Sequence, residues 1–301
     1  MIKKKAFTRI FVVTFVLILF LCFCYIKKDK PIIKENNYSS NYSNVYLLTN
    51  DYVVKTTMYI NEKNLEEKTK KYISSIIKEN SENILLPDNF EPIIPAGTKL
   101  LDLKIDNDII KIYFSKEFEN ATEKQYEKIL ECLTYTIMQE ENILGIEIYA
   151  QDNMIKYIPQ TSKLIPTLLD LNYGINKTYE ITSNKNINKI VEFYYMLVGD
   201  KYLMLPVTIY KNDNREKVEI VVDDLSGFIY YNDLISYVDS NLKLIKYELG
   251  DEIKLYFNRE LKDEEMNQII YSVFANYNSN KISIYYNENK ILEKNKKDIE
   301  K

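Results

Sequence analysis

A strand pattern that occurs twice constrains this chain more than any other feature. The segment Ile110–Phe118, IKIYFSKEF, returns as Ile253–Leu261, IKLYFNREL. Each copy alternates apolar and polar residues, which is typical of a strand with one face in a core. A helical stretch follows in both copies, and then a second matching strand, Ile146–Tyr149 in the first and Ile282–Tyr285 in the second. The chain is therefore predicted to be a tandem of one domain type.

The alternation within this repeated strand predicts its buried face. Successive side chains of a strand point to opposite faces, so the apolar members of each copy share one side. The predicted core residues are Ile110, Ile112 and Phe114 in the first copy and Ile253, Leu255 and Phe257 in the second. A slip of one residue would exchange the two faces, so the burial of these side chains tests the register.

Length and charge bound the class of protein. A chain of 301 residues suits about two domains. Residues 1–30 hold seven basic groups and one acidic group, whereas the rest of the chain holds 33 basic and 43 acidic groups, a balance of −10. A body with this acidic balance repels nucleic acid, so we expect no nucleic-acid partner.

An apolar run near the N-terminus predicts a membrane anchor. Ile10–Ile26 is seventeen residues long, Thr14 is its one clearly polar member, and a basic segment precedes it. That length is at the short end of the range that spans a bilayer, and it exceeds a typical signal-peptide core. The basic groups favour an N-terminus inside the cell, so we expect a single-pass protein of the cell membrane with extracytoplasmic C-terminal domains. A lipid anchor on Cys22 or Cys24 is disfavoured, because a large apolar residue precedes each.

Each repeat is expected to hold two β-hairpins, two helices and a last strand. In the first repeat the predicted strands are 45–48, 52–60, 99–105, 109–115 and 144–150, and the predicted helices are 64–80 and 122–140. In the second repeat the predicted strands are 190–197, 202–210, 242–248, 252–258 and 282–286, and the predicted helices are 214–225 and 263–277. This order predicts an α+β fold in which each repeat is a small, mostly antiparallel sheet with two helices on one face.

Composition along the chain divides it into seven expected segments. They are a cytoplasmic basic N-terminus (1–9), a transmembrane anchor (10–26), a tether (27–44), a first domain (45–153), a linker (154–188), a second domain (189–289) and a charged tail (290–301). The linker contains two prolines and no long periodic run, and the tail is expected to be frayed.

The residue types that catalysis needs are scarce. The chain has no His, so it can build neither a Ser-His-Asp triad nor a His-ligated metal site. Cys132 lies among apolar helix residues and is interpreted as a buried small hydrophobe. Neighbouring acids at 106/108, 140/141, 223/224 and 251/252 are interpreted as solvated, and none of the six glycines builds a phosphate-binding loop. We therefore predict no catalytic residue, no cofactor and no metal, in a protein that is not an enzyme.

The first repeat resembles the GerMN domain of sporulation and spore germination proteins. The resemblance lies in Ile94–Leu101, IPAGTKLL, in the strand Ile110–Phe118 with Ser115 at the family's Ser, and in the last strand Ile146–Ala150. The second repeat departs from the pattern at 238–241, VDSN, where the Pro-Gly turn is missing, and at 258, where Asn replaces the Ser. Its assignment therefore depends on its match to the first repeat.

This resemblance implies a fold and a role. Members of the family are typically membrane-tethered, non-catalytic envelope proteins with two such domains, similar in fold to the ring-building domains of secretion-like assemblies. The chain would then support assembly of a sporulation- or germination-related complex, with envelope proteins or a second copy as partners and no small-molecule substrate. Two other interpretations stay open: a regulator of a cell-wall enzyme, and a small-molecule-binding module in the groove between the repeats.

Four tyrosines are the candidate partner-binding residues. Tyr113 and Tyr149 fall on the sheet face opposite the core of the first repeat, and Tyr256 and Tyr285 recur at matched positions in the second. Tyrosine combines a large contact area with a polar tip and is enriched in interface cores. The alternative is that these residues simply suit strands, since the chain holds 27 tyrosines, or that the linker covers them.

Overall fold

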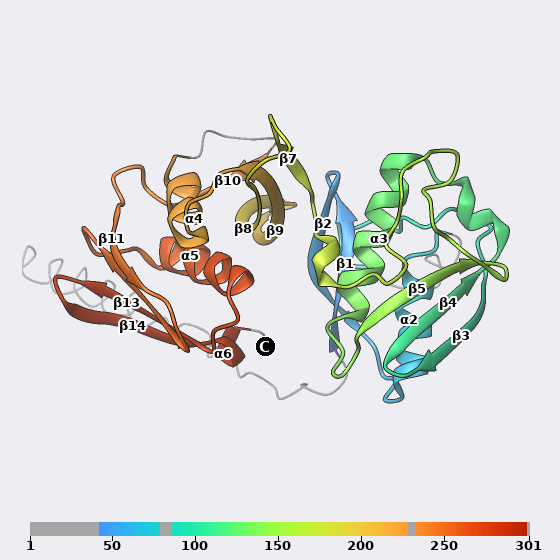
Figure 1. Cartoon of the computed structure of the whole chain (residues 1–301). Helices are drawn as coiled ribbons and strands as arrows, with labels where there is room; N and C mark the ends of the chain where they lie inside the picture. The colour runs from blue at the N-terminus through green and yellow to red at the C-terminus, as the bar shows by residue number, and fades with distance from the viewer. Residues whose placement is uncertain (1–41, 79–85, 228–232, 300–301) are drawn as a thin grey trace, which may run out of the picture. The chain divides into compact units, whose positions relative to one another are not determined.

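The computed structural model describes residues 42–78, 86–227 and 233–299 (Figure 1). Residues 42–301 cluster as one compact unit. The predicted anchor at 10–26 and most of the tether at 27–44 lie outside the described residues. Within the described ranges, no helix is long and apolar enough to cross a membrane.

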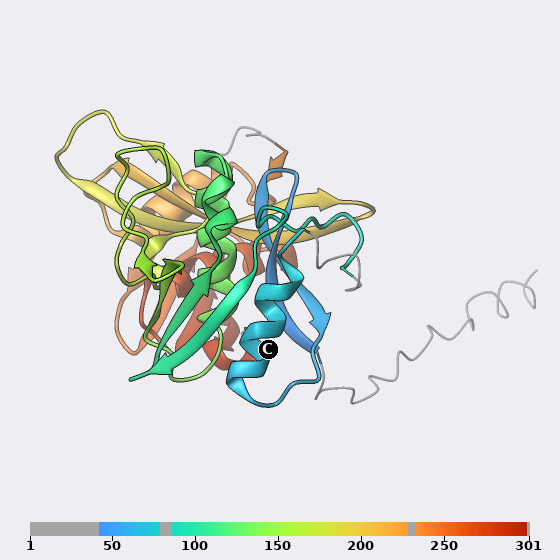
Figure 2. The ribbon, with the colours of Figure 1, turned by 90° about the vertical axis from the view of Figure 1, so that its right-hand side faces the viewer.

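The first repeat consists of a two-stranded hairpin, two helices and a four-stranded sheet. Its elements are β1 (Tyr42–Thr49), β2 (Tyr52–Tyr59), α2 (Leu65–Ser75), β3 (Leu100–Asp106), β4 (Ile109–Phe114), the 3-10 helix η2 (Lys116–Asn120), α3 (Glu123–Ile137), β5 (Gly145–Ala150) and β6 (Asn153–Met154). The sheet has the strand order β3-β4-β5-β6, and β1 pairs with β2. Helices α2 and α3 lie between the hairpin and the sheet (Figures 1 and 2).

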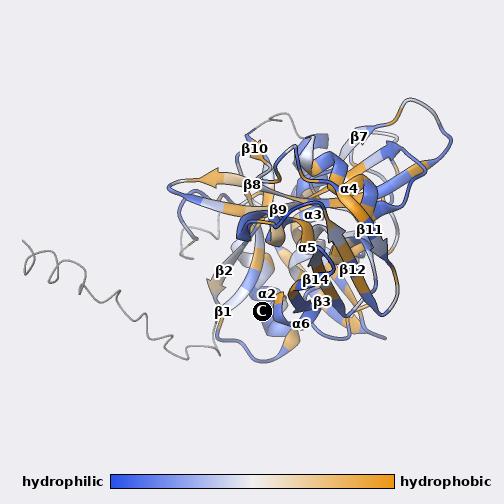
Figure 3. Cartoon of the chain, turned by 90° about the vertical axis from the view of Figure 1, so that its left-hand side faces the viewer, coloured by the Kyte–Doolittle hydropathy of each residue, from blue (hydrophilic) through white to orange (hydrophobic). Residues whose placement is uncertain are grey.

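The second repeat follows the same order. Its elements are β7 (Thr178–Glu180), β8 (Ile187–Val198), β9 (Lys201–Asn212), α4 (Lys217–Ser226), β10 (Leu234–Ile235), β11 (Leu244–Glu248), β12 (Glu252–Phe257), α5 (Asp263–Asn276), β13 (Lys281–Tyr286), β14 (Asn289–Asn295) and α6 (Lys296–Ile299). One sheet has the order β11-β12-β13-β14 and the other β10-β8-β9-β7. Figure 3 shows hydrophobic stretches, in orange, in the region of α4, α5 and β12.

One detail of the predicted architecture needs correction. The helices of each repeat do not cover a single sheet, because the hairpin β1–β2 or β8–β9 packs on their other side. Helix α3 can serve two layers because its central residues, from Ile129 to Leu133, are all buried. Each of the two sheets is mostly antiparallel, as predicted, and its central pair, β4–β5 or β12–β13, is parallel. Helices α3 and α5 make the crossover that a parallel pair requires.

The expected frayed tail is also wrong for residues 290–299. Asn289–Asn295 forms β14, which pairs antiparallel with β13. The turn between them uses Asn287 and Glu288 with φ of 47° and 62°. Backbone pairing with β13 orders this charged strand, and Leu292 packs against the second hydrophobic core. A pairing with a partner strand leaves no signal in composition.

Short-range signals explain where the elements begin and turn. Asn64 caps α2 by accepting from the Glu66 N–H, and Thr122 forms a capping box with Gln125 at the start of α3. The hairpin β3–β4 turns at Asn107 and Asp108, with φ of 49° and 62°. Two consecutive positive φ values match the twist of the flanking strands and favour Asn and Asp.

The predicted core face of the repeated strand is confirmed. Ile110, Ile112 and Phe114 have no exposed surface, and Ile253, Leu255 and Phe257 are at most 3% exposed. The parallel partner strand supplies Ile146 and Ile148 in the first repeat and Ile282 and Ile284 in the second, and these four are buried as well. The register of both sheets therefore follows from the alternation.

A helix closes one edge of each hairpin at matched positions. The Tyr46 N–H of β1 donates to Thr136 Oγ1 of α3 at 2.9 Å, and the Val191 N–H of β8 donates to Asn276 Oδ1 of α5 at 3.0 Å. Ser272 Oγ of α5 also accepts from the Phe193 N–H at 2.9 Å. These side chains satisfy backbone groups that an open strand edge would expose to other chains.

Much of the expected linker packs on the first repeat. Its apolar residues Ile155, Ile158, Ile165, Leu169 and Ile175 are buried in the first hydrophobic core. The domain boundaries drawn from composition stay a prediction, and this packing favours assigning residues 155–175 to the first domain.

Candidate interaction surfaces

The four candidate tyrosines form two stacked pairs. Tyr113 on β4 lies directly opposite Tyr149 on β5, and their rings stack with centroids 4.5 Å apart at 18°. Tyr256 on β12 lies opposite Tyr285 on β13, with centroids 4.6 Å apart at 18°. In-register parallel strands place these rings side by side on the face away from the core. All four side chains are half-buried.

A lysine from the neighbouring strand covers each pair. Lys104 Nζ of β3 lies 4.9 Å from the centroid of the Tyr113 ring, and Lys246 Nζ of β11 lies 4.8 Å from that of Tyr256. This is the distance range of a cation–π contact. The two repeats thus present the same Lys-Tyr-Tyr row across three strands, and we call each row a tyrosine face.

Carboxylates complete each tyrosine face. In the first repeat, Tyr149 Oη donates to Glu147 Oε2 at 2.7 Å, and this hydrogen bond raises the pKa of Tyr149 to about 12. In the second, Glu248 accepts from Lys246 at 2.6 Å and from Lys254 at 3.0 Å, and these bonds lower the pKa of the Glu248 carboxyl to about 2. Both faces therefore combine exposed aromatic carbon with fixed charges of both signs.

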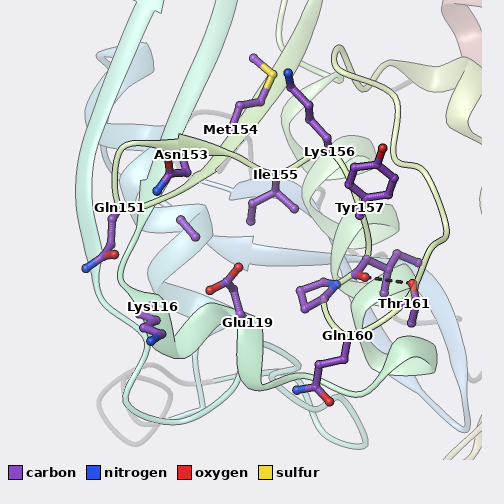
Figure 4. Close-up of a pocket in the computed structure, with 13 residues that line it drawn as sticks. Lys116, Glu119, Gln151, Asn153, Met154, Ile155, Lys156, Tyr157, Gln160 and Thr161 are labelled. Atoms are coloured by element: carbon purple, nitrogen blue, oxygen red, sulfur yellow. Dashed lines mark hydrogen bonds between the residues drawn. The ribbon is translucent and has the colours of Figure 1, made fainter.

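The described residues form a cavity beside the first repeat and another in the second repeat, and Lys246 of the second tyrosine face lines the latter. The larger, about 510 Å³, opens beside β5 and β6 (Figure 4). It is lined by Lys116, Glu119, Ala150, Gln151 and by 153–161. The second, about 310 Å³, lies between α4 and β11 and is lined by Arg215, Glu219, Asp223 and by 244–247. Among the described residues, no group of three or more His, Cys, Asp or Glu side chains could hold a metal ion.

Cys132 occupies the environment that its sequence neighbours predicted. The side chain is fully buried in the first core, and it is a free thiol. Burial raises the pKa of this thiol far above its usual range. A thiol that is neutral and out of reach is not a nucleophile.

Sequence reasoning missed two buried polar clusters. Glu131 of α3 is 1% exposed, and it accepts from Lys128 Nζ at 3.0 Å and from the Asn176 N–H at 3.0 Å. Glu192 of β8 has no exposed surface and accepts from Tyr194 Oη. The local signal for Glu192 was an acid at an inward position of an alternating strand. Glu131 had no such signal, because its backbone donor Asn176 lies 45 residues further along the chain.

The first repeat matches a known family model. The family model described as Germane, sporulation and spore germination, matches residues 44–155. This range covers the first repeat through β6. With the second repeat built on the same plan, the chain resembles tandem GerMN-domain proteins.

Comparison with individual proteins points to GerM. The chain is 26% identical over 222 residues to the spore germination protein GerM of Bacillus subtilis (strain 168), covering 73% of this chain and 57% of the relative. It thus spans little more than half the length of that relative. The solved tandem GerMN domains of the sporulation protein GerM from Bacillus subtilis superpose with a TM-score of 0.74 at 21% identity, covering 82% of this chain and 90% of that structure. The chain is therefore related to GerM and has its tandem fold.

Proposed function

We propose that this protein is a membrane-anchored, non-catalytic envelope protein that supports assembly of a sporulation- or germination-related complex. The observation that carries the proposal is the recurrence of the tyrosine face in both repeats. Partners are envelope proteins or a second copy of the chain, and contacts run through Tyr113/Tyr149, Tyr256/Tyr285 or both pairs. The relationship to GerM supports the cellular setting of this proposal.

The chemistry of the tyrosine faces fits protein recognition. Each face offers two tyrosine rings that the sheet already holds in place, so little side-chain entropy is lost on binding. Hydrogen bonds and ion pairs within the chain hold the charged side chains around the rings. These side chains form a polar rim around the aromatic centre, as in typical protein interfaces. A partner with complementary charge and an apolar centre would bury the rings.

The test is in-cell crosslinking with paired substitutions. Tyr113→Ala/Tyr149→Ala and Tyr256→Ala/Tyr285→Ala should each keep the circular dichroism spectrum of the parent, and at least one should abolish partner crosslinking. A matched control is Tyr179→Ala/Tyr210→Ala, because these rings also stack, 5.1 Å apart at 11°, but lie on β7 and β9. Crosslinking that survives both test variants would place the binding surface elsewhere.

The membrane topology has a separate test. The apolar run Ile10–Ile26 and the basic groups before it support an anchor with residues 44–301 outside the membrane. Protease added to intact, wall-stripped cells should then remove both repeats. Full protection of the repeats would contradict this topology.

The 510 Å³ cavity favours one alternative function, a small-molecule-binding module. Its lining mixes the charged Lys116, Glu119 and Lys156 with amides and Tyr157, as a polar ligand would require (Figure 4). This cavity belongs to the first repeat and the segment after it, rather than to the groove between repeats that the sequence suggested. A ligand-induced rise in melting temperature that Lys156→Ala removes would favour this alternative. The proposal of a cell-wall enzyme regulator keeps its own test, which is assay of wall hydrolysis with and without the protein.

A further inference from the structure

Glu192 is a buried acid with an incomplete set of hydrogen bonds. It lies in the middle of β8, and its side chain faces inward with those of Ile190 and Tyr194. Its Oε2 accepts from Tyr194 Oη, whereas no described residue donates a hydrogen bond to its buried Oε1. An ionised carboxylate in this position would lack solvation that an apolar interior does not replace.

Two charged groups from other elements interact with Glu192, namely Asp224 of α4 and Lys211 of β9. Asp224 of α4 accepts two hydrogen bonds from Lys211 Nζ of β9, at 2.8 and 2.6 Å. Lys211 Nζ also lies 3.6 Å from Glu180 of β7. One ammonium group therefore serves the carboxyls of Asp224 and Glu180, and the uncharged Tyr194 is the donor that remains for Glu192. Burial first, and then the charge of Asp224, raise the pKa of the Glu192 carboxyl well above its usual range.

We infer that Glu192 is held as the neutral acid, sharing its proton with Asp224, and that this carboxyl pair is a proton-dependent lock fastening α4 to the β8–β9 hairpin. Two adjacent carboxyls can hydrogen-bond only when one carries a proton. The shared proton joins β8 to α4, and Lys211 then joins α4 to β9. Loss of the proton would place two negative charges side by side in a buried site.

The first repeat shows that the fold does not require an acid here. Thr136 of α3 and Asn276 of α5 bond the matched strand residues Tyr46 and Val191, so the residue after each is equivalent. In the first repeat that residue is Leu47, which has no exposed surface. The same inward position thus packs as an aliphatic side chain in one repeat and as an ionisable acid in the other. What the acid adds is dependence on the proton.

The sign of the pH effect follows from the raised pKa. The folded chain keeps the proton at a pH where the unfolded chain has already released it. Between the ordinary pKa of Glu and the raised pKa in the fold, the folded state therefore binds more protons, and stability falls as pH rises. Acidification has the opposite effect and tightens the α4 contact.

The test uses the full chain in detergent, with Glu192→Gln as the neutral near-isostere and Glu192→Leu as the residue of the first repeat. At pH 7 the infrared spectrum of the wild type should contain a protonated-carboxyl C=O band that both variants lack. Glu131→Gln, which changes another buried acid, is the control and should keep the band. The wild-type melting temperature should fall from pH 5 to pH 8, and this fall should be smaller in Glu192→Gln and Glu192→Leu.

Two results would overturn the inference. One is a wild-type spectrum at pH 7 without a protonated-carboxyl band, which requires no variant to fold. The other is a band, or a fall in melting temperature, that both Glu192 variants keep unchanged. If Glu192→Gln does not fold, Glu192→Leu supplies the comparison, and if neither folds the wild-type band decides.

Discussion

Removing the side chain of Asn176 should cost several kcal/mol of stability, about 3–6 kcal/mol. Asn176 is 4% exposed and joins strands of both repeats. Its Oδ1 accepts from the Val53 N–H at 2.8 Å, and its Nδ2 donates to Val53 O at 2.8 Å and to Pro206 O at 3.0 Å. Val53 belongs to β2 and Pro206 to β9, so one amide side chain holds the two hairpins together.

The magnitude follows from the groups that would lose a partner. Asn176→Gly leaves three buried backbone groups without this partner, at about 1–2 kcal/mol each, so we expect a loss of about 3–6 kcal/mol in the free energy of unfolding. Asn176→Ala should lose about 1 kcal/mol more, because residue 176 has φ of 49° and a Cβ without a polar tip is disfavoured there. Glycine adopts this φ freely, so the pair of variants separates lost hydrogen bonds from backbone strain.

The assay is urea unfolding of a fragment spanning residues 42–301, followed by circular dichroism. The free energies of unfolding are compared between variants with the same dependence on urea concentration, the m value. The exposed Asn172→Ala, four residues before, is the control and should stay within about 0.5 kcal/mol of the parent. If Asn176→Gly also stays within that range, the hairpins are held together by apolar packing and the reasoning fails. If Asn176→Gly and Asn176→Ala lower the free energy of unfolding equally, the positive φ of residue 176 does not disfavour alanine.

Three further outcomes are expected. Phe114→Ala should lower the free energy of unfolding by about 3–5 kcal/mol, because the ring is fully buried against Phe118. Lys111→Ala, on the opposite face of the same strand, should change it little. Equal effects of the two substitutions in urea unfolding would show that the strand register is wrong. Cys132 should react with a thiol reagent only in denaturant, and labelling of the native protein at a comparable rate would contradict its burial. Hydrogen bonds from Arg259 are the main cause that lowers the pKa of Glu265 to about 2 in the folded chain. Stability should therefore fall as pH drops from about 4.5 towards 2, because Glu265 becomes protonated. Glu265→Gln should flatten this part of the acid-unfolding curve, and an unchanged curve would assign the acid sensitivity to other carboxyls.

The tandem organisation was predictable because strand alternation is a local property. The inward triplets, the hairpin turn at Asn107 and Asp108, and the cap at Thr122 each depend on residues close in the sequence. The stacking of Tyr113 on Tyr149 was half-predictable. Alternation placed both rings on one face, but their contact required β4 and β5 to be parallel and in register.

Other features had no local signal. The Asn289–Asn295 strand is charged, and it is ordered through the backbone of β13. The segment expected as a linker buries five isoleucine and leucine residues in the first core, at spacings that fit neither a helix nor a strand. Irregular segments are packed by whatever surface lies beside them, so their burial cannot be obtained from periodicity.

By itself the sequence determined that this protein is a tandem of one α+β unit, which residues form the centre of each sheet, and that chemistry based on histidine is excluded. These properties follow from periodicity and composition, which are readable without coordinates. The tertiary structure alone decided that each helix pair lies between a hairpin and a sheet and that Asn176 bonds strands from both repeats. Such contacts join residues tens of positions apart, and the free energy of a buried polar group depends on the partners that folding brings to it.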